Sequence, residues 1–456
     1  MNIKLSDIIK WTGGSCDNDS ADFEFTGVST DSRSIKPGEL FIPLVGENFN
    51  GHKFIQKVLE NGAAGFLYAE NAEDIPGEGI RISVNDTLRA FQDIACNYLR
   101  QFHIPVVAIT GSNGKTTTKD ILAHLLSQKY KVLKSLKNYN NEIGVPTTVM
   151  QLTPDIEVLI VELAMRGVGQ IRELARIVSP DIALITNIGE AHFELLGSIE
   201  AIAQTKSEIL EYLAPHGFAV LNADDNWYSW LSGKSGAQVV SFGMKNDAGI
   251  QLIDKKDLGL GGFDLDVKIE NREFSFHLPL LGVHNIYNSL SAIAIAHCLR
   301  LSPQQISEGM KTLIPSDKRM EVRQSAGGWT VLNDSYNASP ASTQGALDIM
   351  KRLPCTGRRI AVLGDMLELG EIAQDSHREV GVKVNEYGID YLLVEGELGA
   401  QIATGARMSG MNSDRVIELE NNERIYEKLK SIVKKGDIIL VKGSRLMKME
   451  EIAEKL

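Results

Sequence analysis

Short apolar runs alternate along the middle of the chain with longer segments that show helical periodicity. The apolar runs predict buried strands at residues 106–110, 156–161, 182–186 and 218–221. Helical spacing of apolar residues between them is clearest at Ile171, Leu174, Ala175 and Val178. Because parallel strands need long crossover connections, this alternation predicts a mostly parallel sheet with helices on both faces.

A second series of strands is predicted in the last third of the chain, at 329–332, 359–363, 391–394 and 437–441. Helical stretches separate them, which is typical of a Rossmann-like sheet. The first hundred residues differ, because turn-forming clusters such as Lys36-Pro37-Gly38 interrupt them before a predicted helix at 87–102. We therefore expect an α/β protein of three domains, spanning residues 1–103, 104–313 and 314–456.

Composition narrows the possible partners. The length of 456 residues suits several domains, and the net charge of −12 argues against a nucleic-acid partner. Four well-separated cysteines form no metal-binding spacing and indicate reduced thiols in a cytoplasmic protein. The N-terminus lacks the apolar core of a signal peptide, and no apolar run approaches the ~20 residues of a membrane span, so we expect no membrane insertion.

The segment GSNGKTTTKD at residues 111–120 directly follows the first strand of the parallel series. In such a strand–turn–helix unit, backbone N–H groups and the positive helix end cradle phosphate oxygens. Lys115 would add charge at the β- and γ-phosphates, and the Thr116 hydroxyl would hold Mg²⁺. The spacing departs from the usual phosphate loop, because Ile109 stands where the first glycine is expected. An ordinary glycine turn is the alternative.

Two further polar residues follow strands of the same predicted sheet, where ligands gather at the carboxyl ends of the strands. Glu162 could ligate Mg²⁺, a cation that prefers oxygen ligands, or it could simply cap the next helix. His192 could be a second metal ligand or a histidine with an ordinary hydrogen-bonding role in a loop.

Lys206 falls on the apolar stripe of a predicted helix at about 199–213. A desolvated lysine loses its charge and becomes nucleophilic, whereas a snorkelling lysine buries only its stem.

Asn285 and Asn288 precede and begin another helix, where amides could recognise adenine or cap the helix. Polar clusters at 333–337, 364–365 and 442–445 end successive strands of the last domain and predict a second binding edge.

These motifs together resemble the Mur ligases of peptidoglycan synthesis. The resemblance rests on TGSNGKTTTKD, GVHNIYN and the lysine of TKSEI, and on STDSRSIKPGELFIPLVGENFNGHKF, NYNNEIGVP, NDSYNASP, VLGDMLELG and VKGSR. It covers essentially the whole chain in the right order. DSYNASP with LGDMLELG is the most specific pair, and it is similar to the members that add D-Ala-D-Ala.

The resemblance implies ATP-dependent ligation of D-Ala-D-Ala to UDP-MurNAc-tripeptide through an acyl phosphate, with two Mg²⁺ ions. It implies small-molecule substrates, a monomer, an N-terminal uridine-nucleotide module, a central ATP domain and a C-terminal domain that brings the dipeptide. Sister Mur ligases, folylpolyglutamate-type ligases and a non-catalytic nucleotide switch remain alternatives. The third peptide residue, lysine or diaminopimelate, stays open.

The resemblance also implies residue roles. The catalytic group would be Lys115, Glu162, His192 and Lys206, and the magnesium ligands would be Thr116, Glu162, His192 and Lys206 as a carbamate. ATP would contact Gly111, Ser112, Asn113, Gly114, Lys115, Thr116, Thr117, Asn285, Asn288, Arg319 and Asp334. The uridine-nucleotide side would involve Ser32, Arg33, Asn140 and Asn141, and the dipeptide would lie near Tyr336 and Asn337.

The chain departs from the family pattern at three places. Asn333 and Ser339 replace the residues of the common DDSYNANP motif, and residues 164–171 differ from the usual GMNHPGEI. The last difference puts side-chain contacts of that loop in doubt, but it leaves the ATP chemistry untouched.

Overall fold

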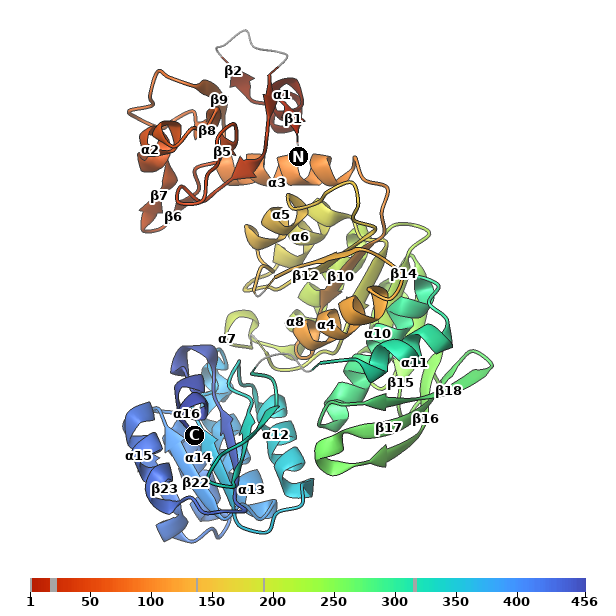
Figure 1. Ribbon diagram of the computed structural model, residues 1–456, viewed down its shortest axis with the longest axis vertical. Coiled ribbons are helices and arrows are strands. Elements are labelled where there is room, and N and C mark those ends of the chain that lie inside the picture. The colour runs from red at the N-terminus through yellow and green to blue at the C-terminus, as the bar shows by residue number, and fades with distance from the viewer. Residues whose placement is uncertain (1, 17–22, 137, 192, 315–317) are drawn as a thin grey trace. The chain divides into compact units, whose positions relative to one another are not determined.

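The computed structural model describes residues 2–16, 23–136, 138–191, 193–314 and 318–456 (Figure 1). The chain divides into two compact units. The first unit comprises residues up to 108 with 130–165 and 170–181, and the second comprises 109–129, 166–169 and 182–456. No helix among the described residues is long and apolar enough to cross a bilayer.

The N-terminal part of the first unit carries, in its described residues, a five-stranded sheet of order β2-β9-β8-β5-β4. Its core includes Phe41, Ile55, Val58 and Phe66. The strands are β1 (Ile3–Lys4), β2 (Ser15–Cys16), β3 (Glu24–Phe25), β4 (Val28–Ser29), β5 (Leu40–Phe41), β6 (Val45–Gly46), β7 (Phe49–Asn50), β8 (Gly65–Ala69) and β9 (Ile80–Val84). The helices are α1 (Leu5–Thr12), α2 (Ile55–Glu60) and α3 (Thr87–Leu99).

The central strands form a nine-stranded sheet of order β11-β12-β10-β13-β14-β15-β16-β17-β18 among the described residues. They are β10 (Val106–Thr110), β11 (Val132–Lys134), β12 (Val158–Glu162), β13 (Ile182–Ile185), β14 (Phe218–Asn222), β15 (Gln238–Gly243), β16 (Ile250–Asp257), β17 (Phe263–Ile269) and β18 (Arg272–Leu278). The helices are α4 (Lys115–Leu126), α5 (Gly144–Val149), α6 (Gln170–Val178), α7 (Phe193–Leu196), α8 (Ile199–Ser207), α9 (Tyr228–Lys234), α10 (Val283–Cys298) and α11 (Pro303–Lys311).

Strands β10, β12 and β13 are buried at every position. Continuous burial means that both sheet faces are covered, as in parallel α/β sheets, and it explains why these segments appear in the sequence as unbroken apolar runs. Pairing is parallel from β13 to β16. The predicted mostly parallel central sheet is thus confirmed.

One end of this sheet was not foreseen. Strands β16, β17 and β18 pair antiparallel and carry alternating buried and exposed residues, most regularly in FDLDVKI of β17. Such alternation is typical of a sheet with one face open to water. Two helices also end earlier than predicted. α3 ends at Leu99, and α8 ends at Ser207 before a 3₁₀ turn at Glu208–Tyr212, a tightening common at helix C-termini.

The C-terminal domain contains a six-stranded sheet of order β19-β20-β24-β21-β22-β23 in its described residues. The strands are β19 (Glu321–Gln324), β20 (Thr330–Asn333), β21 (Arg359–Leu363), β22 (Tyr391–Glu395), β23 (Val416–Leu419) and β24 (Ile438–Lys442). The helices are α12 (Pro340–Arg352), α13 (Ala373–Glu386), α14 (Gly399–Met408), α15 (Asn422–Ile432) and α16 (Glu450–Lys455).

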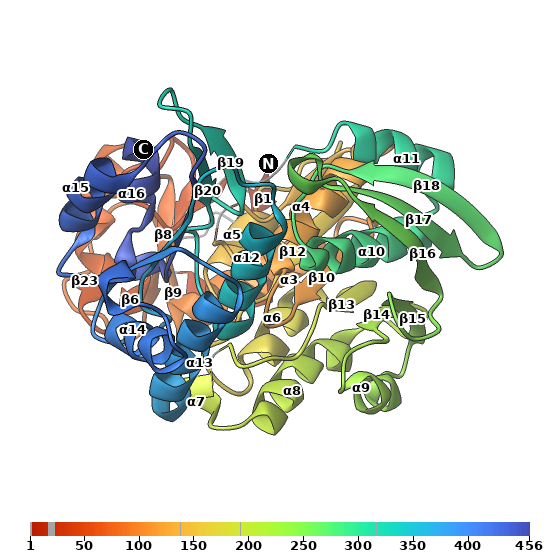
Figure 2. The same ribbon diagram turned by 90° about the horizontal axis from the view of Figure 1, so that it is seen from below.

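Successive residues of these strands point into two different cores. Ala361 and Leu363 pack with residues of α12, α13 and α14, whereas Ile360 and Val362 pack with α15 and α16. Figure 2 shows α12 and α13 on the side of the sheet opposite α15 and α16. All pairs but the edge pair β19–β20 are parallel, so the predicted Rossmann-like domain is confirmed.

Candidate active site

The phosphate-loop segment connects β10 to α4 through two glycines with positive φ, Gly111 at 142° and Gly114 at 86°. A Cβ atom on Gly111 would lie 1.9 Å from the Thr186 hydroxyl oxygen, and one on Gly114 would lie 2.2 Å from Asn288 Oδ1. Both positions therefore require glycine, for backbone conformation and for space.

Asn187, the second residue after β13, holds this loop with backbone and side-chain hydrogen bonds. The Ser112 N–H donates to the Asn187 carbonyl at 2.9 Å, and the Asn113 N–H donates to Asn187 Oδ1 at 3.0 Å. Asn187 Nδ2 in turn donates to the Asn113 carbonyl at 2.9 Å. The loop is thus held in one shape before any ligand arrives. Sequence reasoning missed Asn187, although its strand-end position is a signal that could have found it.

Lys115 contacts the loop, and its charge also acts on a second lysine, Lys206. Lys115 Nζ donates to the Gly111 carbonyl at 2.6 Å. Lys206 on α8 is only 1% exposed, so it does not snorkel. Burial lowers the Lys206 pKa well below its usual value, and the charge of Lys115 lowers that pKa further. No carboxylate among the described residues is recorded pairing with Lys206.

A site with this donor set suits an anion. The positive end of α4 and the Lys115 ammonium meet at one glycine-rich loop. Thr116 and Thr117 follow in the first turn of α4 and are half-buried. The arrangement fits the phosphates of a nucleotide, because backbone dipoles and a lysine are what phosphate loops offer.

In the first unit, Glu162 ends β12 and is 3% exposed. Its Oε1 accepts a hydrogen bond from Asn140 Nδ2 at 3.0 Å, so two of the predicted residues come together. Asn141 Oδ1 instead accepts from the Gly144 N–H at 2.9 Å near the start of α5. His192 lies outside the described residues.

The described residues contain no group of three His, Cys, Asp or Glu side chains that could hold a metal ion. Mg²⁺ in nucleotide sites needs only one or two protein ligands, since phosphates and waters supply the rest. A buried carboxylate such as Glu162 and a hydroxyl such as Thr116 fit that requirement by their chemistry.

Asn285 and Asn288 are both buried in the first turns of α10. Asn285 Nδ2 donates to the Leu281 carbonyl at 2.8 Å, and Asn288 Nδ2 donates to Asn285 Oδ1 at 2.8 Å. The close approach of Asn288 to Gly114 places this amide pair against the phosphate loop. The structure therefore shows the two amides bonded to each other and to the backbone.

In the C-terminal domain, the strand ends bring together four predicted residues. Lys442 Nζ donates to Asp334 Oδ2 at 2.5 Å and to the Asn337 carbonyl at 2.9 Å. The Arg319 guanidinium carbon lies 4.0 Å from the centre of the Tyr336 ring. The departure at Ser339 also has a local explanation, because Ser339 forms a capping box at the start of α12.

Ser32 and Arg33 lie in a turn after β4 of the first unit. The Arg33 guanidinium bonds Asp31 at 2.8 Å, which holds the pKa of the Asp31 carboxyl at about 2. Arg33 is almost fully exposed. In the described part of the chain, the recorded side-chain contacts of Ser32 and Arg33 are those between Arg33 and Asp31.

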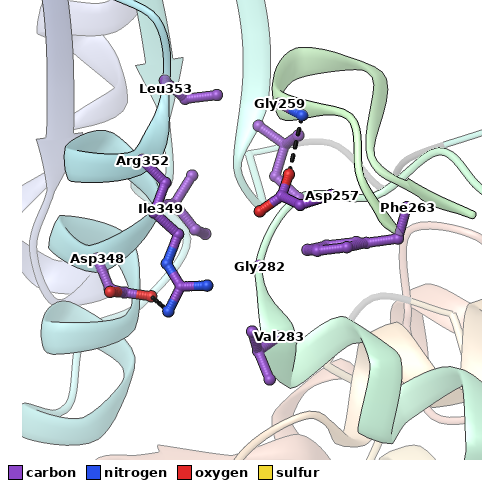
Figure 3. A pocket seen from close by; sticks show the side chains of 10 residues that line it. Asp257, Gly259, Phe263, Gly282, Val283, Asp348, Ile349, Arg352 and Leu353 are labelled. Atoms are coloured by element: carbon purple, nitrogen blue, oxygen red, sulfur yellow. Dashed lines mark hydrogen bonds and ion pairs between the residues drawn. The ribbon is translucent and has the colours of Figure 1, made fainter. Parts of the chain in front are cut away.

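A small cavity in the second unit is lined by none of the predicted site residues (Figure 3). It is lined by the β16–β17 hairpin, the start of α10 and the end of α12. Asp257 accepts from the Gly259 N–H at 2.8 Å, and Asp348 pairs with Arg352 at 2.9 Å. Its volume of about 20 Å³ has room for one water molecule, so it holds no nucleotide or peptide.

Family models match nearly the whole chain. They are the Mur ligase family catalytic domain at residues 24–108, the Mur ligase middle domain at 109–296, and the Mur ligase glutamate ligase domain at 318–445. The chain belongs to the Mur ligase family. A Mur ligase of Bacillus subtilis, named UDP-N-acetylmuramoyl-tripeptide–D-alanyl-D-alanine ligase, is 37% identical over 94% of this chain and 93% of its own length.

Solved Mur ligase structures agree with this assignment. A MurF crystal structure from Acinetobacter baumannii has a TM-score of 0.92 at 26% identity, covering 100% of this chain and 99% of that one. MurF ligase from Thermotoga maritima, solved in complex with ADP, has a TM-score of 0.83 at 28% identity, covering 94% of this chain and 96% of that one. The three-domain Mur ligase fold is therefore the fold of this chain.

Proposed function

We propose that this protein is an ATP-dependent amide-bond-forming ligase that joins D-Ala-D-Ala to UDP-MurNAc-tripeptide. The products would be UDP-MurNAc-pentapeptide, ADP and phosphate, in cytoplasmic peptidoglycan precursor synthesis. The observation that carries the proposal is the clamped phosphate loop with Lys115 against it. The name of the Bacillus subtilis relative supports the choice of substrates.

The chemistry requires ATP because a carboxylate oxygen is a poor leaving group. Transfer of the γ-phosphoryl group to the tripeptide carboxylate would form an acyl phosphate, which the dipeptide amine then attacks as phosphate leaves. Charge spreads over the γ-phosphoryl oxygens, so catalysis is mainly positioning and electrostatics. In this chain the loop backbone and Lys115 would supply both.

Magnesium would neutralise phosphate charge when bound. Thr116, Glu162 and His192 would hold it, with Lys206 as a carbamate. A neutral, buried Lys206 amine could add CO₂ with loss of a proton, which would turn it into an oxygen ligand. A carbamate ¹³C signal in ¹³C-bicarbonate that disappears in Lys206→Ala would support this modification, and its absence from the wild-type protein would exclude it.

The three modules would divide the work. Residues 1–103 would bind the uridine nucleotide, 104–313 would bind ATP and 314–456 would bring the dipeptide. We expect a monomer, which sedimentation analysis would test. Asn140 and Asn141 would also serve the uridine nucleotide, although they fall within 104–313. Because Asn140 bonds Glu162, it would connect the uridine-nucleotide side to the metal side.

The decisive experiment is phosphate release from Mg·ATP with UDP-MurNAc-tripeptide, with and without D-Ala-D-Ala, with product mass read from the same reaction. We expect release that needs both substrates and a product heavier by the dipeptide. Release that is indifferent to the dipeptide, or none at all, would contradict the proposal. Profiling of amino-acid and folate acceptors would then test a sister or folylpolyglutamate-type ligase, and tight nucleotide binding without turnover would indicate a switch.

A further inference from the structure

Tyr336 in the C-terminal domain is approached by two guanidinium groups. The Arg319 carbon atom Cζ lies 4.0 Å from the ring centre, and Arg445 Cζ lies 5.7 Å from it. Tyr336 and Arg445 follow β20 and β24, which are neighbouring parallel strands with Asn333 opposite Val441. Both therefore lie at the sheet edge where ligands of such sheets bind.

The other charges at this edge are largely compensated within the domain. Lys442 is nearly fully buried and pairs with Asp334 at 2.5 Å. Lys318 pairs with Glu450 at 3.5 Å and with Glu454 at 3.1 Å. Arg319 has no recorded carboxylate partner in the described part of the chain, and the family resemblance assigns it to the nucleotide.

Arg445 is the cation that remains available for a second anion. Its Nη1 bonds Glu450 Oε1 at 3.1 Å, the same oxygen that Lys318 approaches, and its side chain is 58% exposed. The Arg445 side chain is exposed although that of Glu450 is largely buried, so the other guanidinium donors can reach a second carboxylate while Nη1 keeps its bond to Glu450. A guanidinium has five N–H donors, and only one of them is recorded in a bond to Glu450.

The acceptor dipeptide presents one anionic group, its terminal carboxylate. That carboxylate must be held while the amine at the other end stays free to attack the acyl phosphate. Arginine suits the task because its planar fork binds a carboxylate through two parallel hydrogen bonds. The Tyr336 ring would hold the guanidinium plane in place, since aromatic faces attract it.

We propose that Arg445 binds the terminal carboxylate of the incoming D-Ala-D-Ala, positioned by its cation–π contact with the Tyr336 ring and its bond to Glu450. The inference rests on the proposed function and adds a substrate-binding residue to it. Arg445 thereby selects acceptors that carry a free carboxylate on the residue next to the one with the reacting amine.

Steady-state kinetics of Arg445→Ala and Arg445→Lys test this role. We expect Arg445→Ala to raise the KM for D-Ala-D-Ala about 10- to 100-fold, because a hydrogen-bonded charged partner is lost. Arg445→Lys should keep part of the affinity through its charge. The KM values for ATP and UDP-MurNAc-tripeptide should stay unchanged. A matched control is Arg424→Ala on α15, another exposed arginine paired with a glutamate, and it should behave as wild type.

A second substrate identifies the contact. D-alanyl-D-alaninamide lacks the carboxylate, so the wild-type enzyme should use it far less efficiently than D-Ala-D-Ala, and Arg445→Ala should nearly abolish that preference. Undiminished preference in Arg445→Ala, or a change confined to the KM for ATP, would overturn the inference while leaving the ligase function standing. A wild-type enzyme that ligates no dipeptide would overturn both.

Discussion

The phosphate loop of the central domain and the strand-end cluster of the C-terminal domain occupy equivalent places in their sheets but are built differently. The loop is held by glycines and by hydrogen bonds between Asn187 and the backbone of Ser112 and Asn113. The cluster is held by ion pairs and by the contacts of two guanidinium groups with the ring of Tyr336. A loop shaped by its backbone can bind a group that many enzymes share, such as phosphate. A cluster built from side chains can be specific for one substrate.

The two regions also treat a buried lysine in opposite ways. Lys442 is paired with Asp334, so its charge is compensated inside the fold. Lys206 is equally buried, but burial lowers its pKa and no carboxylate is recorded to compensate it among the described residues. Ion pairing makes Lys442 a structural element of the cluster. A compensating carboxylate is thus what distinguishes Lys442 from Lys206.

The largest effect should come from Lys115→Ala, which removes the positive charge at the phosphate loop. We expect a loss of roughly 10³-fold in turnover, because one electrostatic contact to a transferring phosphoryl group is lost. Circular dichroism should show an unchanged fold. Lys311→Ala, an exposed lysine of the same domain, is the control. Turnover like that of wild type would remove Lys115 from the mechanism.

Asp334→Ala breaks the compensated pair of the C-terminal cluster. It should lower the free energy of unfolding by about 3 kcal/mol, because it leaves the buried Lys442 charge unpaired. Adding Lys442→Met should restore most of that loss, since an apolar side chain tolerates burial. Denaturant unfolding of the single and double variants measures both effects, and a double variant no more stable than the single would contradict the ion-pair interpretation.

Gly114→Ala separates backbone strain from close packing in the loop. We expect a loss of about 2 kcal/mol in stability together with a raised KM for ATP, because the new Cβ meets Asn288 Oδ1. Gly388→Ala is the matched control, with a φ of 70° and open space around its Cβ position. Equal losses in both variants would mean that packing against Asn288 is unimportant.

The smallest effect should appear at Glu395, which ends β22. Burial and the neighbouring carboxylates of Asp365 and Glu451 raise its pKa from 4.5 to about 7. A raised folded-state pKa means that the folded protein binds the extra proton, so stability falls as the pH rises from 4.5 to about 7.

Glu395→Gln should therefore increase stability by about 1 kcal/mol at pH 8, after allowance for solvent screening, and should have little effect at pH 4. Thermal melting across this pH range is the measurement. Glu427→Gln on α15 serves as an exposed control. A wild-type profile that is flat between these pH values would show that Glu395 is not protonated in the fold.

The sequence determined the parallel strands, because segments covered on both faces must be apolar throughout, as in β10, β12 and β13. It also indicated the phosphate loop, because the glycines meet a local backbone requirement and Lys115 follows them directly in the sequence. It did not indicate the antiparallel strands β16 to β18, since half-exposed strands carry weaker apolar signals.

Tertiary structure alone decided which distant groups meet. Asn187 reaches Asn113, Asn140 reaches Glu162, and Arg319 and Arg445 share the ring of Tyr336. It also decided between the two interpretations of Lys206, because an apolar stripe shows that a stem is buried but not whether the amine reaches water. Periodicity encodes which face of an element is buried. Partners across the fold depend on how strands are ordered in the sheet, which no local pattern specifies.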